Sequence, residues 1–379
     1  MPRNLSVVIA LFAALVTLPE VAEAAPPSEA PGSYIVVLKD GADAGRVADE
    51  HGRRHGAAVG HVFRDGVKGY AARLPESRLA ALRADDRVAY VEPDGVMTAS
   101  AQTLPWGVNR IDADVSSALA GNGSGAVAGV DVYVIDTGIS ANPDLNLVGH
   151  ANWTGDGKQY DCNGHGTHVA GTIGARDNTA SVVGVAPGVH LAGLKALGCD
   201  GSGPTSNIVA AVNWVATYAP KPAVANLSLG GPPSQALDDA VRRAAAAGVL
   251  MVLAAGNEGV DACTVSPARA GAGTSNGVVT VGATDSSNRA ASFSNYGACV
   301  DIWAPGVSVT STWPSGGLAT ASGTSMASPH VSGAAGLHLS RNPTASAAST
   351  EATLKANVLA PGITSRDGRA VRIVYAGRY

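Results

Sequence analysis

Short apolar runs alternate with longer amphipathic segments from residue 130 onward. Apolar runs of this length are typical of strands that are covered on both faces, and the segments between them predict helices. The predicted strands are Val130–Ile135, Leu191–Ala196, Val224–Leu229, Val249–Ala254 and Val278–Ala283. The predicted helices are His168–Ala175, Thr205–Tyr218, Ser234–Ala247 and Ser325–Ser340. This alternation constrains the fold more than any other feature, because it predicts an α/β fold around a mostly parallel sheet.

The chain ahead of this pattern differs in composition. Residues 25–100 hold 10 Lys/Arg and 11 Asp/Glu, whereas the 279 residues from 101 onward hold 15 and 17. Predicted strands in this first part are Tyr34–Leu38, Tyr70–Leu74 and Arg87–Val91, and predicted helices are Gly41–His55 and Glu76–Ala84. The order predicts a separate small α+β domain, and the small, polar segment Met97–Thr103 predicts a cleavable linker after it.

The first 24 residues predict an export signal. Arg3 precedes the apolar segment Leu5–Leu18, and small residues follow at Val21-Ala-Glu-Ala24. An N-terminal membrane anchor is the alternative, but the apolar segment is short for a membrane span, and no later stretch reaches about 18 uninterrupted apolar residues. We therefore expect a secreted protein without stable membrane association.

Charge and cysteine content narrow the class of protein further. The formal net charge is −4, only 15% of residues are charged, and no cluster of Lys and Arg occurs. Binding to nucleic acid through a basic face is therefore not expected. Four cysteines in an exported chain, with no Cys-x-x-Cys pair, favour two disulfides over metal or redox chemistry.

A carboxylate ends the first strand of the larger part. Asp136 directly follows the apolar Val132–Ile135, and Gly138 allows a sharp turn. A carboxylate at the end of a buried strand is costly without a hydrogen-bonding partner. Asp136 is therefore predicted to be either an acid that orients a histidine or a simple turn cap.

Two histidines occur at the start of the next predicted helix, in Asp161-Cys-Asn-Gly-His165-Gly-Thr-His168. We predict that the helix begins near His168 and that His168 is the general base, because a helix start holds a side chain rigidly. A metal site is the alternative, since Asp161, His165 and His168 offer three ligands. The spacing around Gly166 does not give the i, i+4 histidine pair of a zinc helix, which argues against it.

Ser325 is predicted to start a helix, within Ser322-Gly-Thr-Ser-Met-Ala327. There it lies near the positive end of the helix dipole and near unpaired N–H groups, which favour a developing oxyanion. Asn257 follows the strand Val249–Ala254 and can donate its amide to the same oxyanion. The alternatives are an ordinary N-cap serine and a turn asparagine.

The order of these motifs distinguishes hydrolase families. The acid, base and nucleophile at Asp136, His168 and Ser325 follow the order of the subtilisins, whereas an α/β-hydrolase has serine first and a Gly-x-Ser-x-Gly motif. The four motifs together resemble the subtilisin superfamily, and its proteinase K-like branch in particular, over residues 105–376. The resemblance implies a serine endopeptidase with a subtilisin-like three-layer fold that needs no cofactor for catalysis.

The resemblance also implies roles for individual residues. It implies a catalytic triad of Asp136, His168 and Ser325, and an oxyanion hole formed by Asn257 and the Ser325 N–H group. Substrate contacts are implied for Ser228, Leu229, Gly230, Gly231, Ala254, Ala255 and Gly256. Because these pocket walls are small and uncharged, we expect a large apolar or aromatic residue before the scissile bond. The disulfides implied are Cys162–Cys199 and Cys263–Cys299.

The first domain resembles the subtilisin-type propeptide, an inhibitor and folding aid, through Tyr34–Leu38 and Ala89–Asp94. Self-cleavage is implied near Ser100–Ala101, which divides the chain into residues 1–24, 25–100 and 101–379. The implied partners are protein and peptide substrates and the chain's own propeptide, and the enzyme is expected to be monomeric.

Asp301 matches a calcium-ligand aspartate of the family, so the resemblance implies structural calcium there. The segment Pro267–Val278 is longer than in proteinase K, which leaves the carbonyl ligands unidentified. Three functions compete with broad protein degradation: a metallohydrolase centred on Asp161, His165 and His168, an inactive relative that only binds, and a processing protease with narrow specificity. The complete set of triad residues argues against the inactive relative.

Overall fold

The computed structural model describes residues 32–94, 102–273 and 275–379 of the chain. The predicted export signal and the predicted cleavage point at Ser100–Ala101 lie outside these residues. The chain divides into two compact units, Met1–Thr98 and Ala99–Tyr379, and each is described by itself.

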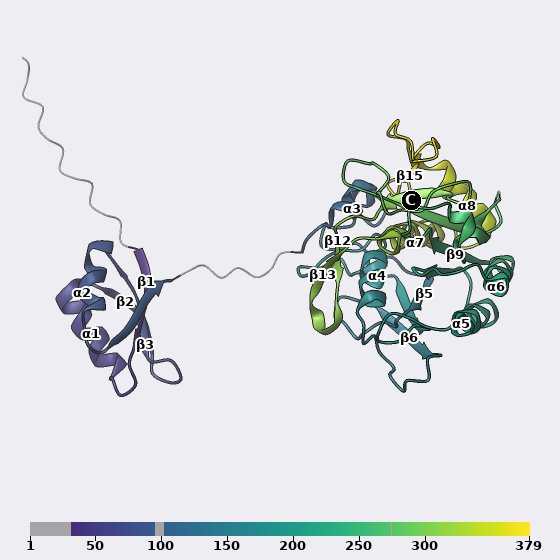
Figure 1. Cartoon of the computed structure of the whole chain (residues 1–379). Coiled ribbons are helices and arrows are strands. Elements are labelled where there is room, and N and C mark those ends of the chain that lie inside the picture. The colour runs from purple at the N-terminus through teal and green to yellow at the C-terminus, as the bar shows by residue number, and fades with distance from the viewer. Residues whose placement is uncertain (1–31, 95–101, 274) are drawn as a thin grey trace, which may run out of the picture. The chain divides into compact units, whose positions relative to one another are not determined.

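The small unit is one antiparallel sheet with two helices on one of its faces (Figure 1). The strand order is β2-β3-β1-β4. Its elements are β1 (Gly32–Leu38), α1 (Ala44–His55), β2 (Ala58–Phe63), β3 (Gly69–Leu74), a short 3₁₀ turn (Glu76–Arg78), α2 (Leu79–Arg83) and β4 (Val88–Pro93). A single apolar core that includes Val36, Val47 and Leu82 lies between sheet and helices. The predicted α+β domain is therefore present, with β2 as a strand that the sequence analysis missed.

The large unit is built on a nine-stranded sheet in the order β14-β15-β11-β10-β9-β8-β5-β7-β6. All described pairs in it are parallel except β14–β15. The strands are β5 (Asp131–Asp136), β6 (Leu147–Asn152), β7 (His190–Lys195), β8 (Ala223–Leu227), β9 (Val249–Ala254), β10 (Val278–Thr284), β11 (Ile302–Pro305), β14 (Val358–Leu359) and β15 (Ile373–Val374). The helices are α3 (Trp106–Arg110), α4 (His165–Gly174), α5 (Thr205–Tyr218), α6 (Gln235–Ala246), α7 (Thr324–Arg341) and α8 (Ala347–Ala356).

The sheet is covered on both faces, which gives the three layers visible in Figure 1. Val132 and Val134 of β5 belong to the apolar core shared with α4, α7 and α8, whereas Tyr133 and Ile135 belong to the core shared with α5 and α6. Since successive side chains of a strand point to opposite faces, one apolar strand feeds both cores. The predicted α/β fold with a mostly parallel sheet is confirmed.

One helix boundary differs from the prediction in a way that matters for the site. α4 begins at His165 rather than near His168. Its N-cap is Gly164, whose φ of 111° lies in the region that favours glycine. A Cβ at this position would lie 2.2 Å from the Trp313 ring. His165 therefore occupies the helix start, and His168 lies one turn inside.

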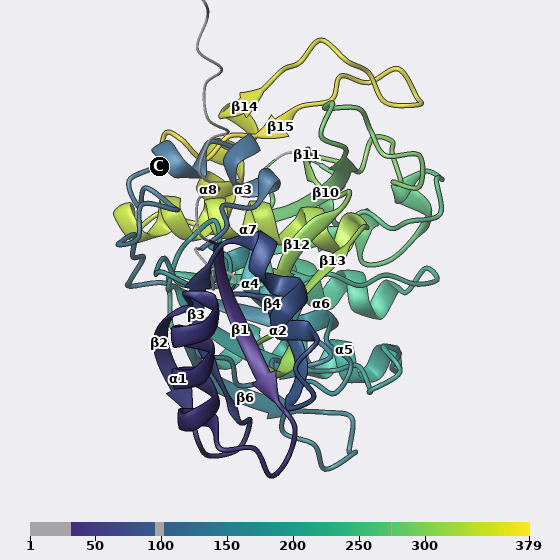
Figure 2. The ribbon, with the colours of Figure 1, turned by 90° about the vertical axis from the view of Figure 1, so that its left-hand side faces the viewer.

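Outside the main sheet, β12 (Val309–Thr312) and β13 (Leu318–Ala321) form an antiparallel hairpin that packs on α4. A long loop between β14 and β15 extends from the edge of the large unit (Figure 2). In the described ranges, no helix combines the length and apolarity needed to cross a membrane.

Candidate active site

Asp136 ends β5 with its side chain fully buried. Its Oδ1 accepts a hydrogen bond from the Thr137 backbone N–H at 2.7 Å and lies 2.7 Å from His165 Nδ1. The carboxylate thus has the histidine partner that its position requires.

His165 pairs with Asp136 from the first residue of α4 and lines a cleft of about 430 Å³ that Ser325 also lines. Its side chain is 29% exposed, so one edge of the ring reaches the cleft. Burial opposes the charged imidazole, but the Asp136 carboxylate outweighs it and raises the pKa of His165 above the usual value. A ring held by a carboxylate and open to a cleft has the properties of a general base.

The prediction that His168 is the base is wrong. Its side chain is fully buried, and its Nε2 lies 3.1 Å from the carbonyl oxygens of Val309 and Ala319. It does not line the cleft, and its ring is not bonded to Asp136. The error follows from the helix boundary, because the predicted helix start near His168 is three residues too late.

Asp161 organises the turn that leads into α4. Its carboxylate, 2% exposed, accepts five hydrogen bonds, from the N–H groups of Asn163, Gly164 and Thr167 and from the hydroxyls of Thr137 and Thr167. These bonds use the carboxylate oxygens that the alternative metal site would need. With His168 turned to backbone carbonyls as well, the three proposed ligands do not converge.

Ser325 is the second residue of α7 and lies at its N-terminal end, as predicted. Its Oγ donates to the carbonyl oxygen of Ser228 at 3.0 Å, and the Ser228 hydroxyl donates to the Ser325 carbonyl at 2.9 Å. This reciprocal pair fixes the start of α7 against the segment after β8. Hydrogen bonds between nucleophile and base are often absent in a substrate-free enzyme, so this geometry is compatible with catalysis.

Asn257 is held beside Ser325 by Thr324. Its Oδ1 accepts hydrogen bonds from the Thr324 N–H at 2.8 Å and from the Thr324 hydroxyl at 3.0 Å. Because the oxygen is occupied, the Nδ2 hydrogens of Asn257 remain as donors next to the start of α7. The oxyanion-hole role of Asn257 and the Ser325 N–H group stays a prediction.

The residues predicted to contact substrate line two neighbouring cavities. Ser228, Leu229, Gly230 and Gly231 line the cleft of about 430 Å³ with His165 and Ser325. A second pocket of about 280 Å³ is lined by Gly230, Gly231, Pro232, Ala254, Ala255, Gly256, Glu258, Val265, Ser266 and Ala268.

Glu258 was missed by the sequence analysis, although it lies directly after Asn257 in the chain. Its carboxylate accepts a hydrogen bond from Asn295 Nδ2 at 2.7 Å and brings one acidic group to the otherwise uncharged second pocket. The expectation of an uncharged pocket therefore needs correction at this point. Its position next to a predicted oxyanion-hole residue was the signal that could have revealed it.

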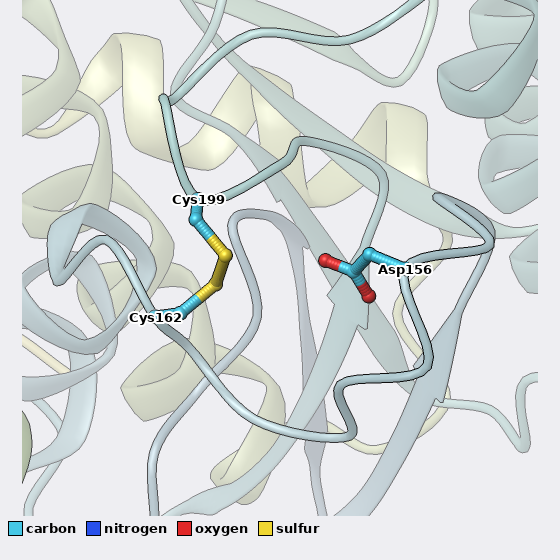
Figure 3. Close-up of side chains that lie close together, drawn as sticks. All are labelled: Asp156, Cys162 and Cys199. Carbon is cyan, nitrogen blue, oxygen red and sulfur yellow. A yellow bond between two sulfur atoms is a disulfide. The ribbon is translucent and has the colours of Figure 1, made fainter.

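Both implied disulfides are present, Cys162–Cys199 and Cys263–Cys299. They close loops of 37 and 36 residues, for which the loop-entropy description gives about 3–4 kcal/mol of stabilisation each. The first joins the turn before α4 to the segment after β7. Asp156 lies beside it (Figure 3), the one place in the described residues where three His, Cys, Asp or Glu side chains converge closely enough for a metal ion. Since both sulfurs are bonded to each other, they are not thiolate ligands.

Asp301 does not fit the implied calcium site. Its Oδ1 is paired with the Lys355 ammonium at 2.7 Å, and its Oδ2 accepts the Thr280 N–H at 2.9 Å. The longer loop presents the N–H groups of Ser275 and Gly277, which both donate to Glu351. Calcium needs six to eight oxygen ligands, and this place offers an ammonium group and N–H donors instead.

A better set of oxygens surrounds Asp144, which the sequence analysis did not identify. Its buried Oδ2 makes no hydrogen bond to a described residue, and its Oδ1 accepts from Asn178 Nδ2 at 2.6 Å. The Gln102 amide nitrogen faces three carbonyl oxygens, those of residues 176, 180 and 182, at 2.7, 3.4 and 3.2 Å. With the two amide groups turned, this region would offer one carboxylate, two amide oxygens and three carbonyl oxygens, which are the kind of donors that calcium prefers.

Both units of the chain match known protein families. Residues 128–370 match the sequence model of the Subtilase family, and residues 33–100 match that of Peptidase inhibitor I9. The extracellular serine proteinase of Thermus sp. (strain Rt41A) is 45% identical over 359 residues, covering 84% of this chain and 83% of that protein.

Two further relatives support the same family. The alkaline serine exoprotease A of Vibrio alginolyticus is 42% identical over 333 residues and 84% of this chain, and the match spans 60% of that longer protein. The crystal structure of a cold adapted subtilisin-like serine proteinase is 40% identical, with a TM-score of 0.62, and covers 72% of this chain and 98% of that one.

Proposed function

The chain belongs to the subtilase family of serine proteases, and from this membership and the geometry of the site we propose that it is a secreted endopeptidase with His165 as its general base. The observation that carries the proposal is the pair of Asp136 and His165 in the same cleft as Ser325 at the start of α7.

In the proposed mechanism, Ser325 Oγ attacks the carbonyl carbon of the scissile peptide bond while His165 Nε2 takes the hydroxyl proton. Asp136 holds Nδ1–H and stabilises the imidazolium that forms. His165 then gives the proton to the leaving amine, and an acyl group remains on Ser325. A water molecule, deprotonated by His165, hydrolyses this ester and restores the enzyme.

The negative charge of each tetrahedral intermediate is proposed to be stabilised by Asn257 Nδ2 and the Ser325 N–H group. Thr324 supports this role, because its two hydrogen bonds hold the asparagine side chain in one orientation. Loss of one such donor reduces turnover by about 10²–10³-fold in serine proteases.

We propose broad specificity with preference for a large apolar or aromatic residue before the scissile bond. The second pocket has the volume for such a side chain and walls formed mainly by glycine and alanine. Glu258 at its lining predicts that lysine is also accepted, since its carboxylate can pair with an ammonium group. A peptide library that shows strict selection for Arg or Glu would contradict this preference.

The small unit is proposed to be the enzyme's own inhibitor and folding aid, removed by self-cleavage near Ser100–Ala101. Its match to the inhibitor family and its separate core support this role. The proposed domains are residues 1–24, 25–100 and 101–379. The extracellular relative from Thermus supports export, and we propose that the mature enzyme acts as a monomer on proteins and peptides.

Structural calcium is proposed at Asp144, not at Asp301. Gln102, Asp144 and Asn178 would hold the ion together with the carbonyl oxygens of residues 176, 180 and 182. A bound ion would neutralise the buried carboxylate and join the N-terminal segment of the large unit to the loop after α4.

The proposed function is tested by labelling the secreted protein with a fluorophosphonate and analysing it by mass spectrometry. We expect one label on Ser325, a mature chain that begins near Ala101, and no label and no propeptide loss in Ser325→Ala. Normal casein cleavage by Ser325→Ala would overturn the proposal. Activity that survives the fluorophosphonate but is abolished by a chelator would favour a metallohydrolase instead.

A further inference from the structure

His168 is a buried histidine that the proposed mechanism does not use. Its Nε2 lies between two carbonyl oxygens, Val309 O and Ala319 O, each at 3.1 Å. Val309 belongs to β12 and Ala319 to β13, so one nitrogen is bonded to both strands of the hairpin. The side chain is completely buried, which makes every polar contact it forms energetically important.

The contacts fix the protonation of the ring. Both partners of Nε2 are acceptors, so Nε2 carries the hydrogen, and Nδ1 is buried without a partner among the described residues. Burial lowers the pKa of His168 to about 4, although the two carbonyl groups act in the opposite direction. The ring is therefore neutral near pH 7, and its Nε2–H group donates to the two carbonyl oxygens.

Other bonds attach the same hairpin to the same turn of α4. The Ser311 hydroxyl donates to the His168 carbonyl at 2.7 Å, and the Thr312 hydroxyl donates to the Thr167 carbonyl at 2.9 Å. Gly171 lets the elements approach this closely, since a Cβ there would lie 2.2 Å from Thr312 Oγ1.

One of the joined elements carries the base, and the other leads along the chain to the nucleophile on α7. α4 begins with His165, and β13 ends at Ala321, four residues before Ser325. The hairpin lines neither the cleft of about 430 Å³ nor the second pocket. A shift of the hairpin should therefore change how nucleophile and base meet more than how the acyl part of a substrate binds.

We infer that His168 is a positioning residue, which sets the hairpin on the base helix and thereby sets the distance between Ser325 and His165. The inference rests on the proposed function, because it needs His165 as base and Ser325 as nucleophile. A misplacement of 1 Å between reacting groups can reduce the rate by about 100-fold, so a tether of this kind has a measurable catalytic effect.

The test compares His168→Gln with His168→Met in the full-length chain. The Gln Nε2 is the same number of bonds from Cβ as the His Nε2 and can donate to both carbonyls, whereas Met has similar length and no donor. Enzyme concentration is set by fluorophosphonate titration, so kcat refers to active molecules. We expect kcat of His168→Met to fall about tenfold or more with KM within about twofold, and His168→Gln to recover kcat to within about threefold of wild type.

Ile173→Val is the matched control, because it removes a buried methylene group from the same helix without touching the hairpin bonds. It should lower Tm and leave kcat unchanged. If His168→Met does not fold, Ser311→Ala provides a second test, with an expected kcat loss of about two- to fivefold at unchanged KM.

Wild-type kcat in His168→Met, or in Ser311→Ala where His168→Met does not fold, would overturn the inference, as would equal losses in the Gln and Met variants. These failures differ from a failure of the proposed function. If His165→Ala abolishes activity and His168→Met retains it, only the positioning role is lost. If His165→Ala remains active, the proposed function itself is wrong.

Discussion

The first turn of α4 holds one histidine, His165, and the next turn holds another, His168. The surroundings of the two rings give them opposite properties. His165 faces a carboxylate and a cleft, whereas His168 faces two carbonyl oxygens in the interior. Burial opposes the charged form of both rings, but Asp136 raises the pKa of His165, and that of His168 falls to about 4. The same residue type on one helix is thus suited to proton transfer in one position and to a fixed hydrogen bond in the other.

Replacing each histidine in turn should show the largest difference between their roles in catalysis. His165→Ala is expected to lower kcat/KM by about 10⁴–10⁶-fold, the range known for triad residues of serine proteases, while His168→Gln should stay within about threefold of wild type. Activity is measured on a chromogenic peptide after the propeptide has been removed by immobilised wild-type enzyme, which is then filtered off. A loss in His168→Gln as large as in His165→Ala would show that the two histidines do not differ in role.

Asp136→Asn tests the carboxylate that partners His165 rather than the imidazole ring itself. Only the neutral base accepts a proton, so kcat/KM of the wild type should rise with pH through the raised pKa of His165. The asparagine variant should lose about 10⁴-fold in kcat, and its remaining activity should have an acidic limb at lower pH, because the carboxylate that raised the pKa is gone. An acidic limb that does not move would mean that Asp136 does not control the titration.

The buried ring should affect acid stability instead of activity. The pKa of His168 is about 4 in the folded protein, below the ordinary value near 6.5, so the unfolded chain binds more protons between these pH values. The contribution of neutral His168 to the free energy of unfolding is fully present above pH 6.5 and is lost as the pH decreases toward 4. His168→Gln should lack this loss, which is on the order of 3 kcal/mol.

Urea unfolding at pH 7 and pH 4, in a Ser325→Ala background that prevents autolysis, measures this difference. Parallel losses of stability in the wild-type and glutamine chains would show that His168 does not titrate as described.

The surroundings of two buried carboxylates also differ, and the expected effect of this difference on Tm is smaller. Asp301 is paired with Lys355, whereas Asp144 keeps a buried oxygen that has no partner among the described residues. A chelator is therefore expected to lower Tm by about 5–10 °C in the wild type and in Asp301→Asn, and to have no effect in Asp144→Asn. Tm of Ser325→Ala chains with and without chelator gives the result. A chelator effect that disappears in Asp301→Asn would restore the calcium site implied by the resemblance.

The sequence predicted the elements whose patterns are long and apolar. The limits of β9 and α5 agree with the prediction, because a continuous apolar strand and an amphipathic helix leave little freedom in their boundaries. Short or weakly patterned elements such as β2, β6 and the β12–β13 hairpin were missed. They are stabilised by partners distant in the sequence rather than by local pattern.

The candidate site was predictable wherever one residue type stood alone at the end of an element, as with Asp136, Asn257 and Ser325. The base was not predictable, because two histidines lie one helical turn apart. The choice between His165 and His168 depends on the start of α4, and this start is set by Gly164 against Trp313 and by the hydrogen bonds of Asp161. The pairing of Asp301 with Lys355 was equally invisible, since 54 residues separate them.

The proposed mechanism requires that His165, and not His168, is the base. ¹⁵N NMR tests it on histidine-labelled Ser325→Ala enzyme whose propeptide has been removed with immobilised wild-type enzyme. The spectra are followed from pH 4 to pH 9, assigned with His165→Ala and compared with the kcat/KM profile of the wild type. We predict that the His165 ring titrates in step with activity, above the ordinary histidine pKa, while the His168 ring remains the neutral Nε2–H form above pH 5. A His168 resonance that titrates with activity, or a His165 resonance that does not, would show that His165 is not the base.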